Sequence, residues 1–161
     1  MQPCTRRNRN IYIILEVESL NYVSEIYVPT KSESDYIGEK LLEYNLGMKP
    51  LEQKVAFIEI NRCIKNSDKE VIGGILAIAA LWNILHIDTM WVKQEFRGNR
   101  IASKLLQDVE EYAKKLGCHL SYLETYDFQA KEFYINNGYK IFGVLGDCPK
   151  GHTCYFLSKR L

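Results

Sequence analysis

The chain has little of what marks secreted, metal-binding or nucleic-acid-binding proteins. Its 161 residues include 5 cysteines, and 21 basic against 20 acidic residues leave a formal net charge of +1. An odd number of cysteines without a C-x-x-C pair predicts no disulfide framework, and their spacing to the histidines predicts no metal site. The near-neutral charge gives no electrostatic footprint for bulk nucleic acid or an anionic membrane.

Long apolar runs are equally scarce. The longest, "GGILAIAALWNIL", is too short for a membrane span, and the N-terminus lacks the apolar region and cleavage site of a signal peptide. We therefore expect a soluble, cytoplasmic protein. The 47% of hydrophobic residues is enough for one folded domain around a single core.

The order of periodic segments predicts a mixed α/β domain. Strands are expected over 11–17, 22–28, 54–62, 70–82, 84–92, 118–126, 139–145 and 154–157, and helices over about 32–46, 100–116 and 127–138. Ser32 and Ser34 are candidate caps for the first helix. The strand–helix–strand unit around Arg97 predicts a parallel crossover. Residues 1–20 are an N-terminal extension, and residues 21–161 are the domain.

The stretch "FRGNRIA", from Phe96 to Ala102, predicts an anion site where a strand passes into a long helix. The first amides of a helix have no partner within it, and the helix dipole adds partial positive charge there. Gly98 allows close approach, and Arg97 and Arg100 add charge, so a diphosphate is the expected occupant. The alternative is a well-capped helix with solvent-exposed arginines. Neither a P-loop nor a G-x-G-x-x-G motif is present.

Two segments carry a resemblance to a known family. "VKQEFRGNRIASKLLQ" resembles the coenzyme A motif of the GNAT superfamily of N-acetyltransferases, [QR]-x-x-G-x-[GA] after a strand, with Arg100 standing where the middle glycine is usual. "YLETYDFQAKEFYINNGY" resembles its second signature, a strand ending in L-E followed by A-x-x-F-Y-x-x-x-G-[FY]. The resemblance implies a single GNAT-like domain, with a central splayed mixed sheet and helices on both faces.

The resemblance also implies acetyl-CoA as the cofactor and a set of residues that bind it. These residues are Trp91, Val92, Phe96, Arg97, Gly98, Asn99, Arg100, Ile101, Ala102, Asp127 and Tyr134. Asp127 occupies a position where the family commonly has an asparagine, and an ionised aspartate cannot donate a hydrogen bond. The alternative role for Asp127 is therefore the cap of the following helix.

The implied reaction is direct attack of a primary amine on the thioester. Such an amine must first lose a proton, which at pH 7 costs about 4.6 kcal/mol for a lysine-like group. Glu124 matches the family's catalytic base in some members, and His86 and Asp88 are competing candidates. Tyr134 matches the tyrosine that commonly protonates the coenzyme A sulfur.

The acceptor side of the site is expected to be aromatic. Its candidate residues are Tyr44, Asn45, Trp82, His86, Asp88 and Tyr126. They favour a small-molecule amine as the acceptor. The alternatives are a protein or peptide amine, or a coenzyme-A-binding module without turnover. A monomer and a homodimer are both compatible with the sequence.

Overall fold

The computed structural model describes residues 26–161 of the chain. The chain divides into two units, residues 1–42 and residues 43–161. The expected strand over 11–17 lies outside the described residues. The expected strand over 22–28 is wrong for its described part, because residues 26–28 belong to no helix or strand.

The first helix, α1, spans Lys31–Met48. Its cap is Thr30 rather than Ser32 or Ser34. The Thr30 hydroxyl accepts a hydrogen bond from the Glu33 amide at 3.3 Å, and the Glu33 carboxylate accepts one from the Thr30 amide at 2.7 Å. This reciprocal pair is a capping box, and it satisfies the amides of Thr30 and Glu33 from within the chain.

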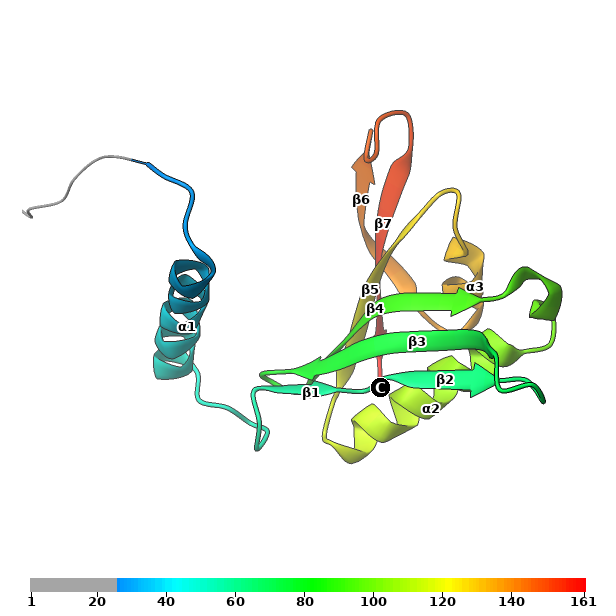
Figure 1. Cartoon of the computed structure of the whole chain (residues 1–161), viewed down its shortest axis with the longest axis horizontal. Coiled ribbons are helices and arrows are strands. Elements are labelled where there is room, and N and C mark those ends of the chain that lie inside the picture. The colour runs from blue at the N-terminus through cyan, green and yellow to red at the C-terminus, as the bar shows by residue number, and fades with distance from the viewer. Residues whose placement is uncertain (1–25) are drawn as a thin grey trace, which may run out of the picture. The chain divides into compact units, whose positions relative to one another are not determined.

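The centre of the second unit is a seven-stranded mixed sheet (Figure 1). Its strands are β1 Phe57–Glu59, β2 Arg62–Lys65, β3 Val71–Ala80, β4 Ile84–Val92, β5 Leu120–Tyr126, β6 Lys140–Gly146 and β7 Thr153–Arg160. The order is β1-β3-β4-β5-β7-β6, with β2 also paired to β3. The single strand expected over 54–62 is therefore wrong, because two short strands pair with opposite ends of β3.

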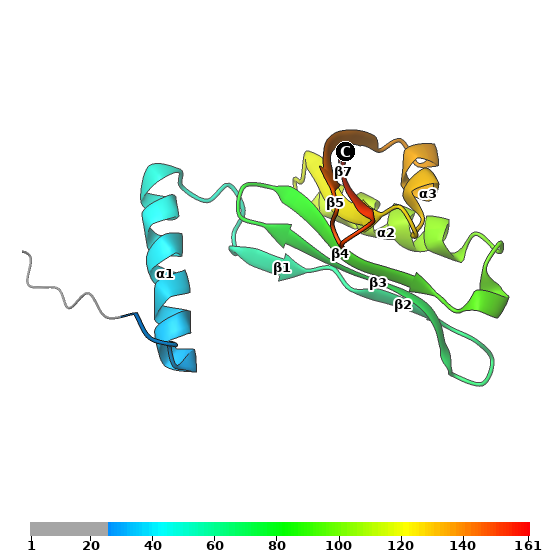
Figure 2. The same cartoon turned by 90° about the horizontal axis from the view of Figure 1, so that it is seen from above.

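Two helices accompany the sheet, α2 over Ile101–Lys115 and α3 over Lys131–Asn136. Figures 1 and 2 show α2 running along β3 and β4. The apolar side of α2 is buried in one core with residues of β3, β4, β5 and β7. The fully buried members of this core include Leu106, Val109, Ile75, Leu85, Leu123 and Leu157. Leu105, Leu106 and Val109, which recur at helical spacing in the sequence, thus form the face that anchors α2.

β4 and β5 form the only parallel pair of strands in the described sheet, and they stay together for a short distance. They pair at Ile84, Leu85 and His86, after which β4 continues to Val92 without a partner in β5. The expected splay of the sheet is confirmed. Because the main-chain groups along this open edge have no β5 partner, they are available to a ligand.

An irregularity in β4 lies just beyond the fork. Leu76 pairs with Thr89 and Ala77 pairs with Ile87, so Asp88 is an extra residue, a β-bulge. Ile87 and Met90 both face the core, whereas strict alternation would place them on opposite faces. Bulges re-aim side chains and are common beside active sites.

Gly73 on β3 sets how closely α2 approaches the sheet. A Cβ at this position would lie 3.0 Å from the Ile101 Cγ2 and 3.3 Å from the Val92 Cγ2. The missing side chain therefore lets the first residue of α2 pack directly on β3.

Candidate active site

The start of α2 carries an uninterrupted run of free amides. Within the described part of the chain, the backbone N–H groups of residues 98–103 have no hydrogen-bond acceptor. The first turn of α2 contains no acidic residue, and the N-cap residue Arg100 makes no side-chain cap bond. The protein therefore does not cap the start of α2 with its own side chains, contrary to the alternative interpretation of this stretch.

Two residues of this turn have left-handed backbone. Gly98 has φ +81°, and Arg100 has φ 58° and ψ 18°. A residue other than glycine, asparagine or aspartate rarely adopts this conformation, which costs about 1–2 kcal/mol. The conformation explains why the family pattern has glycine where this chain has Arg100. The arginine keeps the backbone path of the glycine and adds a charge to it.

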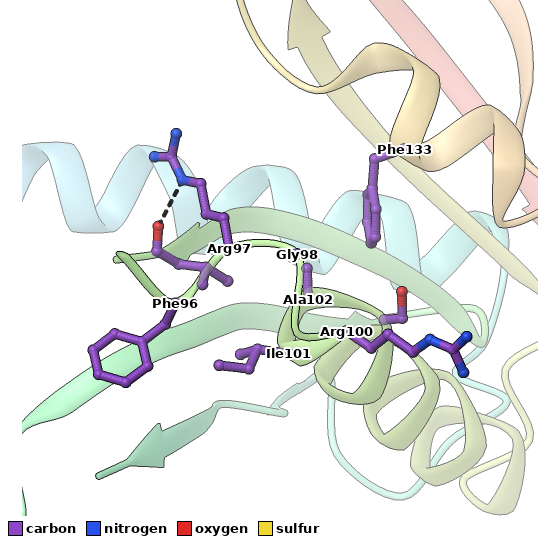
Figure 3. A pocket seen from close by; sticks show the side chains of 9 residues that line it. Phe96, Arg97, Gly98, Arg100, Ile101, Ala102 and Phe133 are labelled. Atoms are coloured by element: carbon purple, nitrogen blue, oxygen red, sulfur yellow. Dashed lines mark hydrogen bonds between the residues drawn. The ribbon is translucent and has the colours of Figure 1, made fainter. Parts of the chain in front are cut away.

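The two arginines of the turn are placed differently (Figure 3). Arg97 donates from Nε to the carbonyl oxygen of Val92 at 3.0 Å, which ties the turn to the end of β4. Arg100 has no such bond, and its side chain is exposed. The Asn99 amide group donates to the Phe96 carbonyl at 3.2 Å and further fixes the turn.

A pocket of about 290 Å³ opens over these amides. It is lined by Val92, Phe96, Arg97, Gly98, Arg100, Ile101, Ala102, Ser103 and Phe133. The first seven were expected from the sequence. Ser103 and Phe133 were missed, although Phe133 is the phenylalanine of the A-x-x-F-Y signature. Phe133 reaches the pocket from α3, on the side opposite the turn (Figure 3). Trp91, Asn99, Asp127 and Tyr134 are not among the lining residues.

Tyr134 lies next to Phe133 on α3 and is buried, with 8% of its surface exposed. Its hydroxyl has no hydrogen-bond partner within residues 26–161. Its ring packs edge-on against Phe133, with centroids 5.1 Å apart, and against Tyr139 at 5.8 Å. Burial raises the pKa of the Tyr134 phenol to about 12, so this group keeps its proton at neutral pH and is available as a donor.

His86, Tyr122 and Glu124 meet at the fork between β4 and β5. The His86 ring stacks on Tyr122 with centroids 4.6 Å apart, and its Nε2 lies 3.9 Å from a Glu124 carboxylate oxygen. That nitrogen is buried without a hydrogen-bond partner in the described residues. A buried nitrogen of this kind is rare in folded proteins and usually has a functional explanation. Tyr122 was not among the residues expected at the site, although it begins the segment that resembles the second signature.

Asp127 is not a helix cap, and this expectation is wrong. Its carboxylate accepts a hydrogen bond from the Thr153 amide at 3.0 Å and lies 3.0 Å from Nδ1 of His152. The residue before α3 is Ala130, which makes no side-chain cap bond. Asp127 instead fastens the end of β5 to the connection between β6 and β7. Its contact with a cofactor stays a prediction.

Within residues 26–161, no hydrogen bond, ion pair or ring contact joins the other candidate acceptor residues to one another. Trp82 donates from Nε1 to the Lys49 carbonyl at 3.0 Å. Tyr126 stacks on Phe128 with centroids 5.2 Å apart, and Asp88 accepts a hydrogen bond from Thr89 Oγ1 at 2.8 Å. Tyr44 and Asn45 lie on α1.

Two further properties concern residues 26–161 as a whole. No helix in this range has the length and apolar character needed to cross a bilayer. Nor does this range bring together three His, Cys, Asp or Glu side chains that could hold a metal ion.

Comparison with known proteins decides the family. The model of the acetyltransferase (GNAT) family matches residues 20–139. The chain belongs to the GNAT acetyltransferase family. The resemblance and the enzyme class that the two signatures predicted, an N-acetyltransferase, are thereby confirmed.

Relatives of this GNAT acetyltransferase include a protein named for its substrate. Blasticidin-S acetyltransferase of Streptomyces morookaense is 38% identical over 93 residues, which cover 57% of this chain and 68% of the relative. Acetyltransferase Atu2258 of Agrobacterium fabrum is 32% identical over 142 residues, which cover 88% of this chain and 99% of that protein.

Solved structures support the same fold. A crystal structure of an acetyltransferase from Bacillus cereus has a TM-score of 0.79 and 37% identity, covering 85% of this chain and 97% of that one. A Bacillus anthracis acetyltransferase in complex with acetyl coenzyme A has a TM-score of 0.57 at 18% identity, covering 64% and 62% of the two chains. The mixed α/β fold class is confirmed.

Proposed function

We propose that this enzyme transfers an acetyl group from acetyl-CoA to a primary amine of a small molecule. The observation that carries the proposal is the run of unbonded amides at residues 98–103, flanked by Arg97 and Arg100. A diphosphate accepts several amide hydrogen bonds at once and is favoured by the positive end of the helix dipole. Coenzyme A contains this group.

The shape of the pocket supports the same donor. The turn provides the amides, and its path depends on the left-handed backbone conformation of Gly98 and Arg100. Phe133 offers an apolar wall opposite them. The open edge of β4 beyond His86 offers backbone groups for the amide-containing arm of the cofactor, and Val92 joins this edge to the pocket.

The groups at the fork suit removal of a proton from the incoming amine. Glu124 is half exposed, so its carboxylate can meet an ammonium group directly or through water. His86 Nε2 faces it at 3.9 Å with no other partner in the described chain, so a small rotation of Glu124 would join the two groups. We therefore assign proton removal to Glu124, with His86 as its neighbour. A general base commonly accelerates a reaction by a factor of about 10²–10⁴.

Tyr134 is assigned to the leaving thiolate. Its hydroxyl is free and protonated, so it can donate a hydrogen bond to sulfur as the carbon–sulfur bond breaks. Acetyl-CoA, when bound, supplies the activated thioester. The amine nitrogen forms the new bond to the acetyl carbon, the carbon–sulfur bond breaks, and the leaving thiolate takes up a proton to become the thiol of coenzyme A.

Acidic and aromatic side chains favour a cationic small molecule as the acceptor. Glu124 and the bulged Asp88 are exposed carboxylates, and Tyr122 and Tyr126 are half-buried rings on β5. Carboxylates attract a protonated amine, and aromatic faces stabilise cations by up to about 2 kcal/mol. The relative that is named for blasticidin S supports an acceptor of this size.

The deciding experiment is a thiol-release assay with acetyl-CoA against a panel of amines. The panel should include blasticidin S, polyamines, aminoglycosides, amino acids and short peptides. We expect turnover with at least one small cationic amine, and a loss of about 100-fold in kcat for Glu124→Gln. Turnover with peptides alone would overturn the small-molecule acceptor. Coenzyme A binding without turnover across the panel would overturn the transferase proposal.

A further inference from the structure

A buried polar network connects α2, β5, β7 and the segment after α3, and none of its residues contacts the substrates in the proposed chemistry. It consists of Glu110 on α2, Ser121 on β5, Tyr139 between α3 and β6, and Lys159 on β7. Tyr139 and Ser121 are almost fully buried, and Glu110 is 6% exposed. A charged carboxylate in such a place is retained only when its oxygens are paired.

Every polar group of the network has a partner. Lys159 Nζ lies 2.6 Å from one Glu110 oxygen, and the Tyr139 hydroxyl donates to the other at 2.9 Å. Because this hydroxyl has a single proton, the 2.7 Å contact with Ser121 must be a bond that Ser121 donates. Burial raises the pKa of Tyr139 well above its usual range, so this phenol keeps the proton it donates.

Tyr139 also contacts Tyr134 directly, through its backbone and through its ring. The Tyr139 amide donates to the Tyr134 carbonyl at 3.0 Å, and the two rings meet edge-on at 5.8 Å and 73°. Tyr134 has no hydrogen bond of its own through its hydroxyl within the described chain, so packing alone orients its ring. Of its two ring neighbours, Phe133 and Tyr139, only Tyr139 is itself fixed by polar bonds.

The network also joins the two walls of the pocket. Glu110 belongs to α2, whose first turn carries the free amides, and Tyr139 follows α3, which carries Phe133. From these contacts we infer that Tyr139, fixed by Glu110, Ser121 and Lys159, is a positioning residue that sets the place of the Tyr134 hydroxyl relative to the amide-bearing turn. This inference rests on the proposed function, in which Tyr134 serves the leaving thiolate.

The test is a double-mutant cycle with Tyr134→Phe, Tyr139→Phe and the double variant. Tyr139→Phe keeps the ring and removes only the hydroxyl. We expect it to lower kcat about tenfold while changing KM for acetyl-CoA less than about twofold. In the Tyr134→Phe background the same change should alter kcat less than about twofold, because Tyr139 acts through Tyr134.

Two controls separate positioning from general damage. Tyr112→Phe makes the same chemical change at an exposed tyrosine of α2 and should leave kcat unchanged. If Tyr139→Phe does not fold, Ser121→Ala replaces it, since that change removes one bond to Tyr139 and keeps its ring and carboxylate partner. The inference would be overturned if the loss in kcat of the double variant equals the product of the two single losses. An unchanged kcat in folded Tyr139→Phe would overturn it as well.

A second readout does not depend on turnover. In protein labelled with fluorotyrosine, the signal that Tyr134→Phe removes is assigned to Tyr134. Tyr139→Phe should shift or broaden that signal, whereas Tyr112→Phe should leave it in place. An unmoved signal rejects the positioning role even if acetyl transfer is found. A moved signal without any acetyl transfer supports positioning and rejects the proposed function instead.

Discussion

The first turns of α1 and α2 differ in whether the protein itself supplies acceptors for their backbone amides. Both helices begin with amides that have no helical acceptor. At α1, Thr30 and Glu33 form a capping box that satisfies two of these amides, those of Thr30 and Glu33, from within the chain. At α2, the corresponding positions are Arg100 and Ser103, and the amides of 98–103 have no acceptor in the described chain. The two helix starts thus differ in whether the protein supplies acceptors, and within the described chain only the second has an uninterrupted run of unbonded amides over residues 98–103.

The largest effect is expected from giving α2 the acid that α1 has. Ser103 occupies the third helical position, as Glu33 does in α1. Ser103→Glu should weaken coenzyme A binding about 100-fold, because a carboxylate would take up the free amides and repel the diphosphate. Calorimetric titration with coenzyme A measures the change.

Ser103→Gln is the matched control, since it has the same size without the charge. It should weaken binding much less than Ser103→Glu. Equal losses in the two variants would show that bulk, rather than charge, is responsible, and would weaken the comparison between the two helices.

A smaller effect is expected from removing the two arginines of the turn. Arg97→Ala with Arg100→Ala should weaken coenzyme A binding about tenfold at low salt and less at high salt, because exposed charges are screened. Titration at two ionic strengths measures both values. Affinity that does not depend on salt in the native protein would mean that the arginines do not face the diphosphate.

Arg100 alone allows backbone strain to be separated from charge. Arg100→Gly and Arg100→Ala remove the same charge, but only glycine adopts φ 58° without strain. We expect the glycine variant to be more stable than the alanine variant by about 1 kcal/mol in denaturant unfolding. If alanine proves the more stable, position 100 does not keep its left-handed conformation in solution.

The smallest effect concerns pH and α1. Hydrogen bonds from the Thr30 amide and then the Thr30 hydroxyl lower the pKa of Glu33. The first turn of α1 is therefore stabilised above the ordinary glutamate pKa, and this contribution is lost as pH falls through the lowered value. NMR chemical shifts of residues 31–35 should move toward coil values in acid, and Glu33→Gln should remove most of that dependence, whereas Thr30→Ala, which keeps the amide donor, should remove only part of it. The first turn of α2 has no acid and should show no such change.

The sequence predicted the structure best where periodicity or a motif decided the outcome. The apolar stripe of α2, the parallel β4–β5 connection and the turn from Phe96 to Ala102 were all expected and are present. The capping box of α1 is visible in the sequence as T-x-x-E, from Thr30 to Glu33, yet Ser32 and Ser34, two and four residues after Thr30, were expected to be the caps.

The remainder could not be predicted because it depends on contacts between distant parts of the chain. Asp127 bonds to Thr153, which lies 26 residues further on, so no local pattern showed that it would not cap α3. The surroundings of His86 Nε2 are formed by Tyr122 and Glu124, which lie on another strand, so no local pattern showed them. The left-handed backbone of Arg100 follows from the path between β4 and α2 rather than from its residue type.

The extra residue in β4, Asp88, changes which side chains of the strand face the core. Up to Ile87 the odd-numbered side chains enter the core, and from Met90 onward the even-numbered ones do. Were Asp88 deleted, the last residues of the strand would turn over, and Val92 would leave the pocket. One inserted amino acid therefore keeps the side chains at the fork between β4 and β5 in phase with Val92 at the pocket.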